Sequence, residues 1–155
     1  MNKKLVFLAC LFLTLLASSI VTANEEYTDE DGNPVKLPDA KTAYSLENPG
    51  PWKKEVAFHD PVIKSRILVQ GLEMTRVLKI TIPHPMGQTA KGVKKLSIKA
   101  IFLVDKDGTV VGYHSFSADD SEAVYETKLN SVINYLEIFV ECRQHGVWLK
   151  KVRLT

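Results

Sequence analysis

The sequence predicts an all-β domain, a sandwich or barrel of about seven strands, preceded by an irregular N-terminal arm. Three observations indicate this fold class. Apolar and polar residues alternate over residues 75–82, an Asp-Gly pair separates two apolar runs near residue 107, and helical spacing of apolar residues is weak throughout residues 52–155. Alternation with period two is typical of a half-buried strand, and an Asp-Gly pair is typical of a tight hairpin turn.

The first 23 residues have the three parts of a secretory signal peptide. Two lysines follow Met1, residues 5–23 carry no charge, and Val21 and Ala23 are the small residues that precede a cleavage site. A single membrane anchor is the alternative, because the uncharged run approaches the length that spans a bilayer. We expect a periplasmic or secreted protein with no stable membrane insertion after cleavage.

Residues 24–51 form an irregular arm that is acidic and rich in proline. The sequence leaves open whether this arm covers a functional site or binds a neighbouring molecule. The β domain itself is expected over residues 52–155.

Several segments of this domain are predicted to be strands. Residues 75–82 form the first, and residues 94–104 and 109–116 are expected to pair as a hairpin around the Asp-Gly turn. A long apolar segment, 131–141, and the alternating segment 146–155 complete the pattern.

The charge balance does not predict a nucleic-acid partner. The chain has 20 basic and 18 acidic residues, and the first 23 residues contain two lysines and no acid. The remainder is therefore formally neutral, without the basic excess that nucleic acids or anionic membranes attract.

Signal cleavage would leave Cys142 as the one cysteine of the exported chain, since the other is Cys10. Small exported domains use cysteines in disulfide pairs, so a single one indicates intermolecular pairing or a thiol with a chemical role. Metal ligation is one such role, because a metal-bound thiol is deprotonated.

The histidines are the other candidate ligands. Three of them, His59, His84 and His145, lie at predicted strand ends or in loops, where side chains can meet at one end of a sandwich. The Cys-x-x-His spacing of Cys142 and His145 lets a thiolate and an imidazole bind one ion. From spacing alone, ordinary hydrogen-bonded histidines are an equal alternative.

Three segments of this domain together resemble the superoxide reductases, the iron domain of the desulfoferrodoxin and neelaredoxin family. They are WKKEVAFHDPVI (52–63), IPHPM (82–86) and ECRQHGVW (141–148). The resemblance covers residues 50–155 and implies an immunoglobulin-like β fold around one non-haem iron ion, held in that family by four equatorial imidazoles and one axial thiolate. It implies that His59, His84 and His145 are equatorial ligands and that Cys142 is the axial ligand.

The same resemblance implies an activity, the one-electron reduction of superoxide to hydrogen peroxide with electrons from an unidentified donor. Three positions depart from the family pattern. Ala90 stands where the fourth histidine belongs, Ala57-Phe58 replaces a Glu-Lys pair, and Glu141 replaces a tyrosine. Lys54 is the candidate for the missing cationic role, and His114 is the candidate for the missing imidazole.

Three hypotheses follow from these residues. The first is an exported iron protein of superoxide reductase type, with altered or lost activity included. The second is a non-catalytic metal-binding domain, because three nitrogens and one sulfur also suit zinc. The third is an interaction module without metal, since HPMGQ (84–88) resembles a stretch of the immunoglobulin-like subunit of the periplasmic thiosulfate-oxidation carrier complex. The oligomeric state stays open, a homo-oligomer included.

Overall fold

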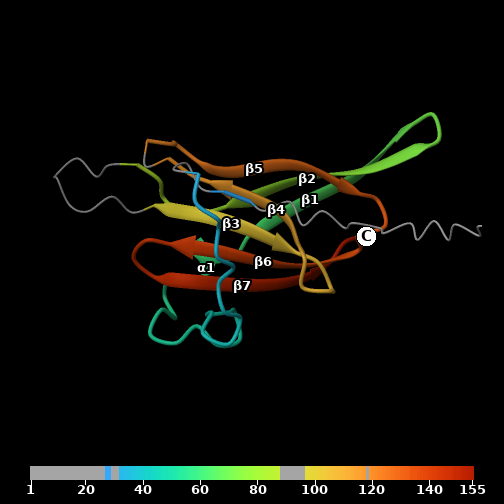
Figure 1. The fold of residues 1–155 in the computed structure, drawn as a ribbon. Coiled ribbons are helices and arrows are strands. Elements are labelled where there is room, and N and C mark those ends of the chain that lie inside the picture. Colours follow the sequence, from blue (N-terminus) through green and yellow to red (C-terminus); the bar gives the residue numbers. More distant parts are fainter. Residues whose placement is uncertain (1–26, 29–31, 88–96, 118) are drawn as a thin grey trace, which may run out of the picture.

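The computed structural model describes residues 27–28, 32–87, 97–117 and 119–155, which form a two-layer β-sandwich (Figure 1). One layer is a three-stranded sheet in the order β1-β2-β5, and the other is a four-stranded sheet in the order β4-β3-β6-β7. All strand pairs are antiparallel. The elements are α1 (Val56–His59), β1 (Val62–Gln70), β2 (Glu73–Ile82), β3 (Ile98–Val104), β4 (Val110–Ser115), β5 (Ala123–Asn130), β6 (Tyr135–Cys142) and β7 (Gly146–Arg153). The predicted all-β class is confirmed.

The predicted strands agree with the observed ones except at their ends. The segment 131–141 was predicted as one strand, but β6 begins only at Tyr135 because residues 131 and 132 form a turn. Part of the segment 94–104 lies outside the described residues. Strands β1 and β5 and the single helical turn α1 were not individually predicted from the sequence. Among the described residues, no helix is both long enough and apolar enough to cross a membrane.

The core lies between the two sheets. Successive side chains of a strand point to opposite faces, so that one face of each strand points into this layer. Strand β2 contributes Leu78, Ile80 and Ile82, and these pack with residues of the opposite sheet, among them Ile101 and Ile138. The burial of these faces sets the position of one sheet on the other.

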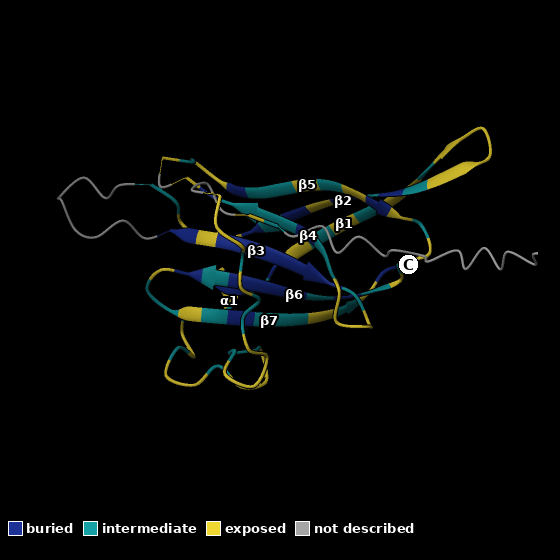
Figure 2. Ribbon diagram, viewed as in Figure 1, coloured by how far each residue is buried: buried dark blue, intermediate teal, exposed yellow. Residues whose placement is uncertain are grey.

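The arm covers the outward face of the four-stranded sheet. Val35, Leu37 and Ala43 pack against a second apolar cluster formed by Ala100, Phe102, Val104 and Phe139. Tyr44 also extends this sheet, because its N–H donates to the carbonyl of Val147 at 2.8 Å and its carbonyl accepts from the N–H of Leu149 at 2.7 Å. The central strands β3 and β6 are therefore buried on both faces (Figure 2).

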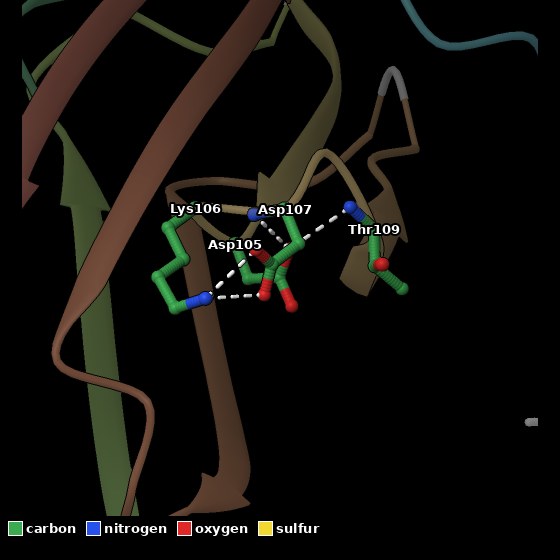
Figure 3. Close-up of polar contacts among 4 residues, drawn as sticks. All are labelled: Asp105, Lys106, Asp107 and Thr109. Atoms are coloured by element: carbon green, nitrogen blue, oxygen red, sulfur yellow. Dashed lines mark hydrogen bonds and ion pairs between the residues drawn. The ribbon is translucent and has the colours of Figure 1, made fainter.

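The β3–β4 hairpin turns where the Asp-Gly pair predicted it. The Asp105 carboxylate accepts hydrogen bonds from the N–H groups of Asp107 and Thr109, both at 2.9 Å, and Lys106 pairs with Asp107 (Figure 3). Gly108 has a φ of 82°, which L-residues with a side chain rarely adopt. These local bonds stabilise the turn that joins β3 to the edge strand β4.

The core packing predicts a clear contrast between two apolar positions in the three-stranded sheet. Replacing the buried Ile80 with Ala should lower the free energy of unfolding by about 2–5 kcal/mol, because a cavity remains. Replacing the exposed Val62 of β1 with Ala should change it by less than about 0.5 kcal/mol. Urea unfolding followed by tryptophan fluorescence measures both values, and equal effects would contradict this description of the core.

Candidate metal centre

Four side chains that are far apart in the sequence converge at one end of the sandwich. His59 ends α1, His84 follows β2, Cys142 ends β6, and His145 lies in the turn before β7. Their potential ligand atoms all lie within 4.8 Å of one another. The two sheets both contribute, so the group depends on the packing of one layer on the other.

The distances between the donor atoms are those of atoms that share one ion. The Sγ atom of Cys142 lies 3.5 Å from Nε2 of His84 and 3.4 Å from Nδ1 of His145, and the latter lies 3.1 Å from Nε2 of His59. Ligands of a tetrahedral zinc ion, with nitrogens at 2.0–2.1 Å and sulfur at 2.3 Å, would be separated by about 3.3–3.6 Å. The donor set therefore fits a single transition-metal ion.

Backbone carbonyls orient two of the imidazole rings. Nδ1 of His59 donates to the carbonyl of Glu55 at 2.8 Å, and Nδ1 of His84 donates to the carbonyl of Pro85 at 2.7 Å. A carbonyl only accepts, so Nδ1 carries the proton in each ring and Nε2 keeps its lone pair. The Nε2 atoms with these lone pairs are the ones that face the other donor atoms, an arrangement common in metal-ligating histidines.

The β6–β7 hairpin positions the thiol and the third imidazole. Cys142 pairs with Gly146 at the end of the ladder, so that only three residues form the turn between them. Gly146 has a φ of 76°, which glycine adopts without steric cost. The N–H of Arg143 donates to the carbonyl of Ser97 at 3.1 Å and ties this turn to the segment before β3. This geometry accounts for the Cys-x-x-His-Gly spacing.

Aromatic rings surround the imidazoles. The indole of Trp148 stacks on His59 at a centroid distance of 4.5 Å and an angle of 9°, and Trp52 meets His145 edge-on at 4.7 Å. Tyr44 of the arm packs in turn against the indole of Trp148, at a centroid distance of 5.7 Å. The arm thus supports the centre indirectly. Trp148 is both a core residue and a neighbour of the donor group.

Burial favours the neutral forms of His59, His84 and Cys142 when no metal is bound. It lowers the pKa of His59 to about 4, an effect that the hydrogen bond to Glu55 opposes and the neighbouring imidazoles increase. Burial also lowers the pKa of His84, and it raises the pKa of the Cys142 thiol. His59 and His84 are therefore ready to bind a cation at neutral pH, whereas the thiol must first lose its proton.

The other candidate residues lie outside this group. His114 lies on β4, where it stacks on Tyr125 at 5.2 Å and meets Phe116 edge-on at 4.7 Å, so it does not replace the missing imidazole. Lys54 is exposed in the turn before α1. Ala90 lies outside the described residues. Glu141, which stands where the family has a tyrosine, forms an ion pair with Lys99 at 3.0 Å.

Sequence reasoning missed the supporting contacts made by Glu55, Trp52 and the carbonyl of Pro85. Glu55 precedes His59 by four residues, a spacing that brings a carbonyl and a side chain together only if α1 forms a helical turn. Four residues without caps or clear apolar periodicity gave no such signal. The role of Trp52 depends on the sheet-to-sheet packing, which no local pattern reveals.

The protonated thiol predicts that metal binding depends on pH. Binding must displace one thiol proton, and the pKa of that thiol lies above its ordinary value, so the apparent affinity should rise about tenfold per pH unit between pH 7 and 8. Competition with a chromophoric chelator measures this slope. The His114→Asn variant serves as a control and should give the same slope, and a pH-independent affinity would contradict the assignment of Cys142.

Comparison with known proteins supports the fold. Neither the models of known protein families nor the curated protein sequences match this chain. A point variant of superoxide reductase (neelaredoxin) from Ignicoccus hospitalis has a TM-score of 0.54 and 18% identity, and the match covers 77% of this chain and 98% of that one. The Ignicoccus hospitalis superoxide reductase itself gives 0.51 and 16% over the same shares of the two chains.

A hypothetical protein from Pyrococcus horikoshii OT3 is a further match. Its TM-score is 0.51 and its identity 23%, over 74% of this chain and 97% of that one. The chain thus spans nearly the whole length of each of these structures. At these identities the likeness establishes the architecture alone, and this chain has the β-sandwich fold of the superoxide reductases.

Proposed function

We propose that this protein holds one iron ion through His59, His84, His145 and Cys142 and reduces superoxide to hydrogen peroxide. The observation that supports the proposal most directly is the convergence of these four donors within 4.8 Å of one another at the end of a superoxide reductase fold. No carboxylate belongs to this group, and imidazole with thiolate is a donor set suited to iron or zinc rather than to magnesium or calcium.

The chemistry of the donor set fits a one-electron reductant. Iron bound here would supply one electron to superoxide, and a thiolate ligand would increase the electron density available for that transfer. The overall change joins one superoxide anion, one electron and two protons to give one molecule of hydrogen peroxide. Four protein donors also leave room for a small molecule to approach the ion.

The residues of the chain provide orientation and exclusion of water. The carbonyls of Glu55 and Pro85 hold two imidazoles in the required tautomer, and Trp148 covers one face of His59. Phe58, in the position of the family lysine, is exposed beside His59. We therefore assign proton delivery to solvent rather than to a side chain.

Zinc is the second candidate metal, because three nitrogens and one sulfur form a donor set that tetrahedral zinc accepts. The two distances to Sγ of Cys142, 3.4 and 3.5 Å, match a tetrahedral site, whereas the 3.1 Å between His145 and His59 is shorter. A zinc ion would stabilise the fold without redox chemistry. The third hypothesis, an interaction module without metal, requires that the four buried or half-buried donors have no ion.

Export and electron supply complete the proposal. Residues 1–23 would direct the chain to the periplasm or the cell exterior, where superoxide would be its small-molecule substrate. Each turnover consumes an electron, so a separate one-electron donor protein or small molecule is required.

Metal analysis and spectroscopy test this proposal. We expect about one iron ion per chain and, upon oxidation, a visible band from charge transfer between thiolate and iron. Cys142→Ser should abolish that band, and His59→Asn should weaken metal binding more than about 100-fold, since it removes a ligand. His114→Asn is the matched control, a histidine on the same sandwich outside the donor group, and it should change neither property.

The outcomes separate the hypotheses. One zinc ion per chain without a visible band would identify the non-catalytic site. A metal-free protein whose stability and spectrum do not respond to Cys142→Ser would exclude both metal hypotheses.

The role proposed for Lys54 has its own test. If this exposed cation attracts the superoxide anion, Lys54→Ala should slow the second-order reaction with superoxide about two- to fivefold at low ionic strength. The effect should shrink as salt is added, because salt screens exposed charges. Lys128→Ala, which removes an exposed cation from β5, is the control. Equal rates for the two variants, measured by pulse radiolysis, would show that Lys54 has no special role.

A further inference from the structure

The β1–β2 hairpin exposes an apolar surface at the end of the sandwich opposite the metal centre. Its tip extends beyond the other strands and is largely exposed (Figures 1 and 2). Five large apolar residues form this surface, which we call the hairpin patch. They are Ile67 (39% exposed), Val69 (62%), Leu72 (104%), Met74 (54%) and Val132 (77%).

The alternation of the strands shows that the hairpin part of the patch continues the inner face of the sheet. Residues 63, 65, 67 and 69 of β1 share one face, and Val69 is paired with Met74. On that face, Ile63 and Ser65 are half-buried under the opposite sheet, whereas Ile67 and Val69 are exposed. The inner apolar face therefore extends past the point where the opposite sheet ends.

Arg76 marks the boundary between the covered and the uncovered parts of this face. It is paired with Ile67, it is buried, and its guanidinium donates to Ser65 Oγ at 2.8 Å and to the carbonyl of Thr155 at 3.1 Å. These bonds close the core at this end. Beyond them, the same face has apolar side chains without any described residue to cover them.

Val132 adds to the patch from a neighbouring turn. Asn130 at the end of β5 is paired with Thr75 at the base of the hairpin, and its side chain accepts from the N–H of Val132 at 3.1 Å. This bond holds the exposed Val132 at the same end of the molecule. Five of the eight large apolar residues that are exposed in the described part of the chain thus gather here.

The opposite face of the hairpin is polar at its tip, where Gln70 is paired with Glu73, and its apolar residues Leu68 and Val77 are half-buried. Lys64, Arg66 and Gln70 of β1 lie on that side with their partners on β2, which include Glu73. A membrane-inserting tip would have to bury Gln70 and Glu73 with Leu72, which is unfavourable because unpaired polar groups are costly in lipid. A tip with exposed apolar side chains on one face and polar side chains on the other is better suited to a protein surface.

We propose that the hairpin patch is the two-fold interface of a homodimer. In such a dimer each copy presents the same surface to the other, so that an apolar face meets a complementary apolar face. The exposed fractions amount to more than three whole apolar side chains per copy. Two such patches and their polar rims would bury on the order of 1,000 Å², which is at the lower limit for a specific interface.

The dimer would leave both metal centres accessible. Strand β2 runs from the hairpin to the loop that holds His84, so the interface and the donor group lie at opposite ends of the same strand. Because the two sites are far apart, a variant can lose dimerisation and keep metal binding, or lose metal binding and remain a dimer. The experiment on the dimer is therefore independent of the experiment on the metal.

Light scattering coupled to size-exclusion chromatography tests the proposal. The protein is purified from the producing cell, its N-terminus is determined by mass spectrometry, and its mass is measured from 1 to 100 µM. We expect the mass of two chains at the higher concentrations. The double variant Val69→Asp/Leu72→Asp should have the mass of one chain, with an unchanged thermal unfolding midpoint at low concentration and unchanged metal content.

Leu46→Asp is the matched control, since Leu46 is an exposed leucine of the arm, 44% exposed, outside the patch. This variant should keep the mass of two chains. A wild-type protein that stays a single chain at 100 µM, or a double variant that still forms dimers, would overturn the proposal. So would a single-chain protein that floats with vesicles of phosphatidylcholine and phosphatidylglycerol, which would assign the patch to membranes instead.

Discussion

The packing of the two sheets on each other is the interaction on which the metal centre depends. His59 and His84 come from segments that flank strands of the three-stranded sheet, whereas Cys142 and His145 come from the end of β6 and the turn before β7 in the four-stranded sheet. No local bond within one sheet brings these pairs together. Side chains such as Ile80 and Ile138, which are fully buried between the layers, fix the distance between them. The donor group is therefore a consequence of core packing.

That packing also imposes a cost, which a metal ion would offset. A buried polar group without a partner destabilises a protein by about 1–3 kcal/mol. His59, His84 and Cys142 are all buried, and the free donor atoms of this group face one another rather than water. Burial also holds the two imidazoles neutral and the thiol protonated. A cation at this position would give each donor a partner.

The sequence predicted the fold class well because period two is a local property. The alternation in residues 75–82 and the Asp-Gly turn at residues 107 and 108 specify β2 and the β3–β4 hairpin without reference to the rest of the chain. The turn α1 escaped prediction for the opposite reason. Its four residues gain their structure from the packing of Val56 against the core and from the bond between His59 and Glu55.

The donor residues were predictable in identity but not in arrangement. The Cys-x-x-His-Gly spacing reflects a hairpin turn, which is local, and so Cys142 and His145 could be paired from the sequence. Their contact with His59, which is 86 positions away from His145, depends on long-range packing. The assignment of His59 to the same site was therefore predicted from a family resemblance and not from local spacing. The same limit applies to the arm, whose contact between Tyr44 and Trp148 has no sequence signature.

X-ray absorption fine structure at the edge of the bound metal tests the central claim most directly, because it reports the atoms that surround the ion. The account predicts one sulfur at about 2.3 Å and imidazole nitrogens at about 2.0–2.1 Å from the metal. A bound metal whose shell contains only oxygen and nitrogen would contradict it, because Cys142 would then not be a ligand.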